Sequence, residues 1–415
     1  MKVLWFENTE PSGYNQSNTL VNGWQDALET IVAQCKEIEL YIAFASQTHT
    51  EPKKNRSVTY IPIHTPYSFL DKIRRSISWN IEAKKTITGA KKIIHDVDPD
   101  IIHVFGTEWT FGLISQHTDT PVVIHIQGCF NEIVKYQYPP NYSFADELYE
   151  KRLHPIQFVE KLFHPNLNKS RKLIENKIWQ ANKFYMGRTE WDNQISEKLH
   201  PGREYYHVDE ALRNPFIHTS QHWQFKDNSK TTLFSTGCSS FWKGPNILLR
   251  TAAILKKKKF EFDWLVAGEM PADLKKIIER KEGTSFKENN IHFLGWQTPD
   301  QLCKHLASSS LYIHNSYIEN SPNSICEAQY IGTPIISTNV GGISSLIESK
   351  KNGILVSSDS PEQMAQTIID SAHNKELLSY ISNESQKTAT YRHSEKNILN
   401  QLLNCYKTIL NHSEH

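Results

Sequence analysis

Short apolar runs alternate with longer amphipathic stretches through the first half of the chain. The runs are rich in β-branched and aromatic residues, whereas one longer stretch places Leu70, Ile73, Ile77 and Ile81 at helical spacing. Buried strands that alternate with helices are typical of a doubly wound, parallel α/β sheet. The predicted strands of this half are Val3–Phe6, Leu40–Phe44, Thr59–Ile63, Ile101–Phe105, Val122–Ile126 and Phe184–Met186.

The same pattern starts again in the second half, so the sequence predicts two Rossmann-like domains. Between the two sets, Pro215 is followed by the polar stretch His218–Lys230, where we place the linker. The predicted domains are residues 1–213 and residues 214–393. The predicted strands of the second half are Thr232–Ser235, Asp263–Ala267, Ile291–Leu294, Leu311–His314, Pro334–Ser337 and Gly353–Val356.

Two further regions are assigned by their composition. Ser394–Leu410 has the spacing of an amphipathic helix with one buried face. Gly128–Phe163 is aromatic and rich in proline, and we expect loops or irregular helices on the first domain there. The buried face of the last helix is predicted from Ile398, Leu402 and Cys405, or from Leu403, Tyr406 and Leu410.

Charge and cysteine content exclude several classes of protein. The 415 residues carry 46 Lys and Arg against 45 Asp and Glu, so the chain lacks a global basic field and no nucleic-acid partner is expected. Six cysteines are scattered without C-x-x-C spacing, and the nineteen histidines show no H-E-x-x-H spacing, so no metal site is indicated. No G-x-G-x-x-G follows the first strand, which argues against NAD. We expect reduced thiols, a cytoplasmic location and no cofactor.

The segment that carries chemistry follows the predicted strand Leu311–His314. Glu319 lies in the loop after this strand, and a helix is predicted to begin near Ser324 and to stop at Gly332. Ligands of open α/β sheets bind beyond the carboxyl ends of the strands, where the first amides of such a helix attract a diphosphate. Glu327, one turn into the helix, is placed to accept two ribose hydroxyl protons.

Each of these carboxylates has a plainer interpretation. Ser324 and Glu327 have the spacing of a capping box, in which each side chain satisfies the other's backbone amide. Glu319 alone would usually be a solvated loop charge. The capping and ligand-binding interpretations of Glu327 both remain open on the sequence.

Two loops elsewhere in the second half favour a ligand site. Strand Thr232–Ser235 runs into small residues and then Lys243, which would meet a phosphate at the carboxyl end of that strand. The spacing is not that of a Walker P-loop. Gly341 and Gly342 follow another strand and allow a close approach of the backbone, and the plainer interpretation of this pair is a tight turn.

Taken together, these motifs resemble family 4 of the retaining glycosyltransferases. The resemblance covers most of residues 231–370. It rests on Glu319 and Glu327 with seven residues between them, on Lys243-Gly244, and on Gly332-Thr-Pro-Ile-Ile followed by Gly341-Gly342.

The resemblance implies a GT-B fold: two Rossmann-like domains that face each other across a cleft, with residues 394–415 crossing back to the first domain. It implies that Glu327 holds the ribose of a nucleotide-sugar donor, that Glu319 lies near the transferring centre, and that Lys243 acts on the diphosphate leaving group. Catalysis would need no metal. The other residues implied in donor binding are Gly237, Cys238, Asn323, Ser324, Ile325 and Gly342.

The first half is more weakly similar to the family, and there the resemblance implies acceptor binding by Gly23, Trp109, Gln127 and Arg188. The chain departs from the family pattern at two positions. Cys238 stands where many members carry an Arg, and Gln127 where many carry a His, so Gln127 keeps hydrogen bonding but loses proton transfer. Arg188 or Arg213 could take over the role of the missing Arg.

An amphipathic basic region of the first domain allows two interpretations. One is an ordinary solvated helix with a buried face, which the sequence favours. The other is contact with the anionic inner face of a membrane, where a lipid-linked acceptor would be reached. The region combines Phe69, Ile73, Ile77, Trp79 and Ile81 with Lys72, Arg74, Arg75, Lys84, Lys85, Lys91 and Lys92.

The sequence therefore predicts an enzyme that moves a hexose from a nucleotide diphosphate sugar to a glycan or lipid-linked glycan, in surface polysaccharide synthesis. Two rival interpretations remain. One is an epimerase or phosphorylase that acts on the same kind of ligand. The other is a non-catalytic sugar-nucleotide-binding or scaffold protein, in which Cys238 and Gln127 mark lost activity.

Overall fold

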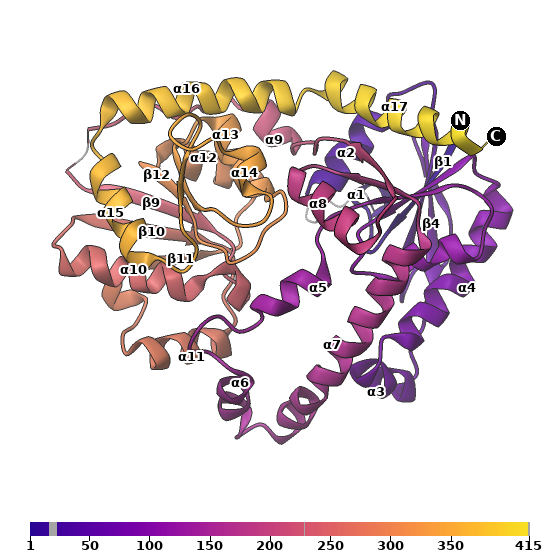
Figure 1. Cartoon of the computed structure of the whole chain (residues 1–415), viewed down its shortest axis with the longest axis horizontal. Helices are drawn as coiled ribbons and strands as arrows, with labels where there is room; N and C mark the ends of the chain where they lie inside the picture. Colours follow the sequence, from indigo (N-terminus) through magenta and orange to yellow (C-terminus); the bar gives the residue numbers. More distant parts are fainter. Residues whose placement is uncertain (16–22, 228, 414–415) are drawn as a thin grey trace. The chain divides into compact units, whose positions relative to one another are not determined.

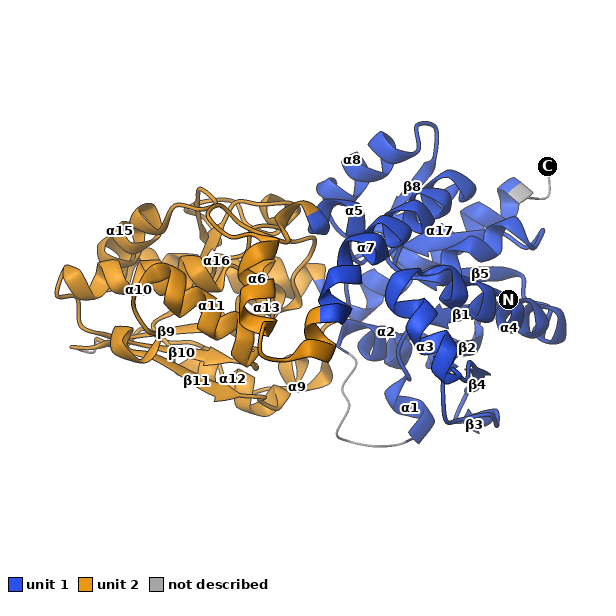
Figure 2. Cartoon of the chain, turned by 90° about the horizontal axis from the view of Figure 1, so that it is seen from below, with its two compact units in different colours: residues 1–134, 159–211, 393–415 blue, residues 135–158, 212–392 orange. Residues whose placement is uncertain are grey.

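The computed structural model describes residues 1–15, 23–227 and 229–413. One residue of the predicted linker, at position 228, lies outside this part. The described residues divide into two compact units (Figure 2). Unit 1 comprises residues 1–134, 159–211 and 393–415, and unit 2 comprises residues 135–158 and 212–392. Each unit is built around one largely parallel sheet.

Unit 1 contains a sheet of strand order β3-β4-β2-β1-β5-β6-β7-β8. All strand pairs in it are parallel except β3 with β4. Its strands are β1 Lys2–Glu7, β2 Glu39–Ser46, β3 Lys53–Asn55, β4 Val58–His64, β5 Ile101–Phe105, β6 Val122–His125, β7 Phe184–Gly187 and β8 Glu204–His207. Its helices are α1 Ser12–Asn15, α2 Trp24–Val32, α3 Phe69–Ile77, α4 Asn80–Val97, η1 Thr110–Gln116, α5 Phe130–Ile133, most of α7 Pro155–Ala181, α8 Glu190–Leu199 and α17 Glu395–Ser413.

Both faces of the unit 1 sheet are covered, because side chains alternate along each strand. On β1, Val3 and Trp5 pack with α2 and α17. Leu4 and Phe6 point the other way and pack with α4 and α7. This two-sided burial explains why the inner strands read as continuous apolar runs in the sequence.

Unit 2 contains a six-stranded, fully parallel sheet of order β11-β10-β9-β12-β13-β14. Helices cover it on two sides, with α10, α11 and α15 on one and α12, α13 and α16 on the other (Figure 1). The strands are β9 Thr231–Thr236, β10 Phe262–Ala267, β11 Ile291–Gly295, β12 Leu311–His314, β13 Ile335–Thr338 and β14 Ile354–Val356. The helices are η2 Val134–Tyr136, α6 Phe144–Lys151, α9 Asn214–Ile217, η3 Phe241–Lys243, α10 Pro245–Lys257, α11 Ala272–Glu282, η4 Lys287–Asn289, α12 Pro299–Ser308, α13 Asn323–Ile331, α14 Ile343–Leu346, α15 Pro361–Ser371 and α16 Lys375–Arg392.

The last helix, α17, closes the core of unit 1. Ile398, Leu402 and Tyr406 are fully buried on it. Trp5 Nε1 donates to the Tyr406 hydroxyl at 3.1 Å, and this hydroxyl lies 2.6 Å from Nδ1 of His103. Burial lowers the pKa of His103 to about 3, so its imidazole is neutral and shares one hydrogen bond with this hydroxyl through Nδ1.

The structure differs from the sequence prediction in three places. Residues 135–158, predicted on the first domain, belong to unit 2, because Tyr142 packs on Phe241 and donates to Glu282 at 2.6 Å. Strands β3 and β8 were missed, because both lie at sheet edges and their polar sequences lack an apolar run. The single amphipathic stretch over Leu70–Ile81 is two helices, which break at Ser78–Trp79.

Replacing Tyr406 by Phe should lower the free energy of unfolding by about 2 kcal/mol, because Trp5 Nε1 and His103 Nδ1 would both be left buried without a partner. Urea denaturation followed by tryptophan fluorescence measures the loss. The control is Tyr41→Phe, which removes an exposed hydroxyl bond to Glu39 and should cost less than about 0.5 kcal/mol. Equal effects of the two substitutions would contradict the role given to Tyr406.

Candidate functional site

The unit 2 sheet reverses its order of strand connection between β9 and β12. Strands β10 and β11 follow β9 in one direction, whereas β12, β13 and β14 continue from β9 in the other. Loops that leave the carboxyl ends of β9 and β12 therefore diverge, and ligands of open α/β sheets bind at such a point. Lys243 follows β9, Glu319 follows β12, and Gly341 and Gly342 follow the next strand, β13.

Glu319 lies at the centre of a cluster of polar side chains. Its Oε1 accepts from Lys243 Nζ at 2.6 Å and from the Ser316 hydroxyl at 2.7 Å, and it lies 3.4 Å from Nε2 of His314. The side chain of Glu319 is 10% exposed, so this carboxylate is not the solvated loop charge that the plainer interpretation predicted. Burial opposes its ionisation, but Lys243 and His314 outweigh burial and hold the pKa of Glu319 well below its usual range.

Close contacts of the backbone fix the loops around this carboxylate. Gly341 has φ 53°, and a Cβ on it would lie 1.8 Å from the Glu319 carbonyl oxygen. The amide of Gly342 donates to the same oxygen at 3.0 Å. The predicted close approach at Gly341-Gly342 is thus made to the loop of Glu319, and only glycine fits at Gly341.

A second close contact joins the loop after β9 to the loop after β12. Gly244 has φ 68°, and its Cβ would lie 1.9 Å from the carbonyl oxygen of Asn315. Nδ2 of Asn315 donates to the carbonyl oxygens of Lys243 and Gly244 at 2.9 and 2.6 Å. The backbone beside Lys243 is therefore bound directly to the strand end that precedes Glu319.

Glu327 is bound by Arg213 rather than by its own helix. Its Oε1 accepts from Nε and Nη2 of Arg213 at 2.8 and 2.7 Å. Helix α13 begins after Pro322 without a side-chain cap, so the capping-box interpretation of Ser324 and Glu327 is wrong. Burial raises the pKa of Glu327, while the Arg213 guanidinium opposes that rise.

The first turn of α13 offers backbone donors next to Glu319. The leading amides of a helix have no acceptor within the helix, which leaves Asn323 and Ser324 free of helical hydrogen bonds. The amide of Ile325 already donates to the carbonyl oxygen of Pro322 at 2.9 Å. Ile325, predicted as a third donor to the diphosphate, is therefore engaged in the turn itself.

The two positions directly after β9, Gly237 and Cys238, supply space but no charge. Gly237 has φ 76°, and nothing lies within 4 Å of a Cβ built on it. Cys238 is buried, and burial raises the pKa of its thiol to about 12, so the thiol stays protonated. The positive charge that an Arg would place at this position is missing from this chain.

Both arginines that were suggested to replace the missing Arg already make contacts within the protein. Arg213 donates through two nitrogens to Glu327. Arg188 is buried in unit 1, where Nη2 donates to the carbonyl oxygen of Gln127 and the guanidinium lies 4.7 Å from the Trp24 ring centre. Arg213 therefore orients Glu327, the predicted ribose carboxylate, through Nε and Nη2.

The residues predicted for the acceptor separate into two groups in unit 1. Gly23 has φ 68° and precedes α2, which begins at Trp24. The guanidinium of Arg188 lies over the ring of Trp24 and donates to the carbonyl oxygen of Gln127. Trp109 points elsewhere, with its ring centre 5.8 Å from that of Trp79. The structure thus connects Gln127 and Arg188 and gives Trp109 a packing role.

Several residues of the unit 2 site were missed by the sequence analysis. His314, Asn315 and Ser316 all touch Glu319 or the Lys243 loop. The sequence could have indicated them through their position at the carboxyl end of a predicted strand, because ligands bind at that edge of the sheet.

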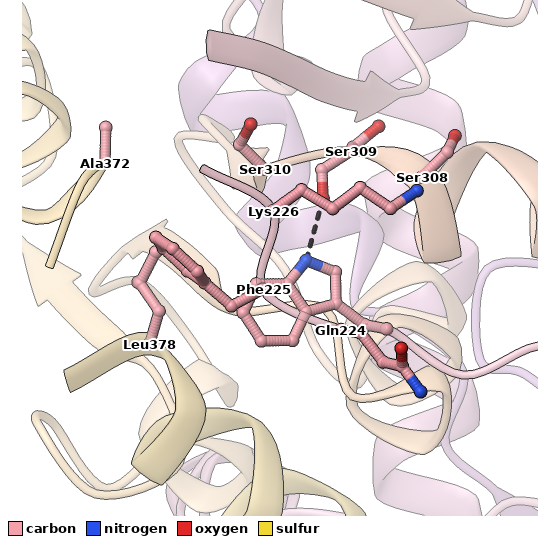
Figure 3. A pocket seen from close by; sticks show the side chains of 9 residues that line it. Gln224, Phe225, Lys226, Ser308, Ser309, Ser310, Ala372 and Leu378 are labelled. Carbon is pink, nitrogen blue, oxygen red and sulfur yellow. Dashed lines mark hydrogen bonds between the residues drawn. The ribbon is translucent and has the colours of Figure 1, made fainter. Parts of the chain in front are cut away.

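A small pocket lies at the opposite edge of the same sheet (Figure 3). Trp223 fills one side of it and donates from Nε1 to the Ser309 carbonyl oxygen at 2.8 Å. Residues 224–226 and 308–310 line it at the amino ends of β9 and β12, and Ala372 and Leu378 line it from the end of α15 and from α16. This pocket belongs to the packing of the linker against α12 and is separate from the site at the carboxyl ends.

A family model and several curated proteins match part of this chain. A family model described as "Glycosyl transferases group 1" matches residues 218–388. An uncharacterized glycosyltransferase of Methanocaldococcus jannaschii is 27% identical over 183 residues, which cover 44% of this chain and 46% of that protein. Poly(ribitol-phosphate) alpha-N-acetylglucosaminyltransferase of Staphylococcus aureus is 25% identical over 166 residues, 39% of this chain and 32% of that protein. The chain thus spans less than half the length of these curated relatives.

Solved structures resemble the whole chain. Sucrose-phosphate synthase of Thermosynechococcus elongatus superposes with a TM-score of 0.74 at 12% identity and covers 99% of both chains. HepE of Anabaena, solved with UDP and glucose, superposes with a TM-score of 0.64 at 13% identity, covering 98% of this chain and 100% of that one. At these identities the likeness shows the fold alone. The chain therefore has the GT-B fold, and its residues 218–388 match a glycosyltransferase family model.

Replacing Arg213 by Met should destabilise unit 2 by about 3 kcal/mol, because Glu327 would be left as a buried, unpaired carboxylate. The double variant Arg213→Met/Glu327→Gln should recover most of this loss, since no buried charge then remains. Urea unfolding curves of the three proteins measure the difference.

The control for this experiment is Arg250→Met, which removes a half-exposed ion pair with Asp359 and should cost about 1 kcal/mol or less. If Arg213→Met costs no more than Arg250→Met, then Glu327 is not held as a buried charge.

Proposed function

We propose that the chain is a retaining glycosyltransferase that moves a hexose from a nucleotide diphosphate sugar to a glycan or lipid-linked glycan in surface polysaccharide synthesis. The observation that carries the proposal is the pair of Lys243 and Glu319, which joins the carboxyl ends of β9 and β12 where the strand order reverses. Retention of the anomeric configuration follows from the resemblance of the Glu319–Glu327 segment to a retaining family.

The diphosphate of the donor is assigned to Lys243 and to the start of α13. An ammonium group has three N–H donors, and Glu319 uses one of them, so Lys243 can also donate to phosphate oxygens. The amides of Asn323 and Ser324 add partial positive charge from the helix terminus. Because Cys238 is a neutral thiol, these two sources carry the stabilisation of the leaving group.

The two carboxylates divide the remaining work of donor binding. Glu327, oriented by Arg213, accepts the ribose hydroxyls as a bidentate acceptor. Glu319 is ionised through the neutral pH range, so it accepts hydrogen bonds from sugar hydroxyls and does not donate a proton. HepE, which has the same fold, was solved with UDP-glucose, and this supports a nucleotide diphosphate hexose as donor.

Kinetics with UDP-, GDP- and ADP-hexoses test this division. Lys243→Met should lower kcat about a hundredfold or more, because it removes charge where the leaving group develops charge. Glu327→Gln should raise the KM for the donor about tenfold, because one ribose contact weakens, and should change kcat less. Lys351→Met, at an exposed pair with Glu348, is the control.

Two outcomes would contradict the proposal. Thermal stabilisation of the protein by a sugar nucleotide without turnover of any donor would support the scaffold alternative. Interconversion of donor sugars without transfer would support an epimerase.

We also propose that the acceptor is reached at an anionic membrane surface through α3. None of the residues of α3 is buried, and Phe69 and Leu70 are 77% and 60% exposed. The favoured interpretation of this stretch, a solvated helix with a buried face, therefore fails for α3. Among the described residues, no helix is long and apolar enough to cross a bilayer.

Helix α3 is held in place by ion pairs of its charged side chains rather than by burial of its apolar side chains. Lys85 of α4 pairs with Asp71 at 2.9 Å, and Arg75 pairs with Glu82 at 2.8 Å. Ser68 and Asp71 form a capping box at its start. The apolar side chains of Phe69, Leu70 and Ile73 remain exposed to solvent. They lie beside exposed Lys72 and Arg74, which is the arrangement of an interfacial amphipathic helix.

Replacing Phe69 and Leu70 together by Ser should reduce sedimentation with phosphatidylglycerol vesicles about tenfold or more, because about 2 kcal/mol or more of apolar burial is lost. Binding to neutral phosphatidylcholine vesicles should be weak for both proteins, because the charge attraction is absent. The matched control is Leu173→Ser, an exposed apolar residue of α7. Unchanged binding of the double variant would overturn membrane contact through α3.

A further inference from the structure

The carboxyl ends of β5, β6 and β7 in unit 1 bring together three side chains of different chemistry. Glu108 follows β5, Gln127 follows β6, and Arg188 follows β7. Gln127 and Arg188 were predicted for the acceptor, whereas Glu108 is the neighbour of Trp109, which packs on Trp79 instead. Glu108 thus joins Gln127 and Arg188 at the carboxyl ends of these strands.

Two glycines make room for the Glu108 carboxyl group. A Cβ on Gly106 would lie 2.5 Å from its Oε2, and a Cβ on Gly128 would lie 2.9 Å from its Oε1. The same Cβ on Gly106 would lie 3.6 Å from Oε1 of Gln127. The carboxyl and amide groups therefore end beside each other over the Gly106 backbone.

The protein uses only part of the hydrogen-bonding capacity of this carboxyl group, which accepts from the backbone of Glu108 itself. Oε2 of Glu108 is buried without a hydrogen-bond partner in the part of the chain that the structure describes. The neighbouring carboxylate of Glu175, in contrast, has several hydrogen-bond partners. It accepts from the Thr107 hydroxyl and from the amides of Phe130 and Asn131 at 2.6 to 2.8 Å. Glu175 holds the loop after β6, and Glu108 has no comparable structural duty.

The charges around Glu108 limit what it can bind. Arg171 of α7 and Arg188 supply positive charge near Glu108, and Glu175 supplies negative charge. Two guanidinium groups disfavour a cation as ligand, and the two carboxylates disfavour an anion. Uncharged hydroxyl groups, which donate to carboxylate and amide oxygens, fit this balance.

We propose that Glu108, together with Gln127, binds vicinal hydroxyl groups of an uncharged sugar at the end of the acceptor. This inference rests on the proposed transferase function. It names Glu108 as a substrate-contacting residue and the acceptor end as a neutral sugar.

The ionisation of Glu108 gives the proposal a direction with pH. Burial first, and then the charge of Glu175, raise the pKa of Glu108 to about 7, while a hydrogen bond from its own backbone and the charges of Arg171 and Arg188 oppose the rise. Below this pH the carboxyl group is protonated, and above it the anion accepts hydrogen bonds from two hydroxyls. Sugar binding should therefore strengthen as pH rises from 6 to 8.

The test measures binding of methyl α- and β-glucopyranoside, galactopyranoside and mannopyranoside to the full chain saturated with UDP, by saturation-transfer NMR. At least one glycoside should bind several-fold more tightly at pH 8 than at pH 6. Glu108→Gln should weaken this binding about tenfold and remove its pH dependence, because a charge-assisted hydrogen bond is lost. The control Glu132→Gln, a carboxylate of α5 that faces Lys198, should change neither.

Thermal unfolding with and without UDP separates this inference from the proposed function. Stabilisation by UDP in Glu108→Gln as in the unchanged protein shows an intact donor site, so a loss of sugar binding then belongs to Glu108. The inference is overturned if no glycoside binds, if Glu108→Gln binds like the unchanged protein, or if glucose 6-phosphate binds more tightly than the glycosides at pH 8. A failure of every nucleotide to stabilise the protein would instead count against the proposed function.

Discussion

The unit 2 site depends on the close approach of three loops at the carboxyl edge of its sheet. Gly244 lies against the backbone of Asn315, and Gly341 lies against the backbone of Glu319. Neither approach leaves space for a side chain. The loops after β9, β12 and β13 therefore form one rigid arrangement, in which Lys243 and Glu319 meet at 2.6 Å.

Electrostatics in this arrangement favours preset charges over proton transfer. A buried carboxylate is costly unless it is paired, and Glu319 and Glu327 are each paired with a base, Lys243 and Arg213. The two pairs differ in what they leave available. Lys243 is 30% exposed and keeps donors for a ligand, whereas Arg213 is bound through two nitrogens and serves mainly to orient Glu327. A site of this kind stabilises developing charge without rearranging at the moment of reaction.

The sequence predicted most strands because both sheets are buried on two faces, which turns each inner strand into an apolar run. It predicted Lys243, Glu319 and Glu327 as a group because they follow strands whose ends share one edge. It could not separate the capping interpretation of Glu327 from the ligand interpretation, since the deciding partner, Arg213, lies more than a hundred residues away in the chain. The same limit applies to Trp109 and Glu108, because adjacent residues in a loop point in different directions that only the packing of Trp79 and Gly106 decides.

The chain passes between its two units at residues 134–135, 158–159, 211–212 and 392–393, so neither unit is one continuous stretch. During synthesis, β1 emerges before the rest of unit 1, but its Trp5 must wait for Tyr406, 401 positions later, to complete its buried hydrogen bond. Unit 2 emerges before α17, which carries Tyr406. The nascent first unit therefore exposes part of one apolar face of its sheet until α17 has emerged, and this is the period in which a chaperone would protect it.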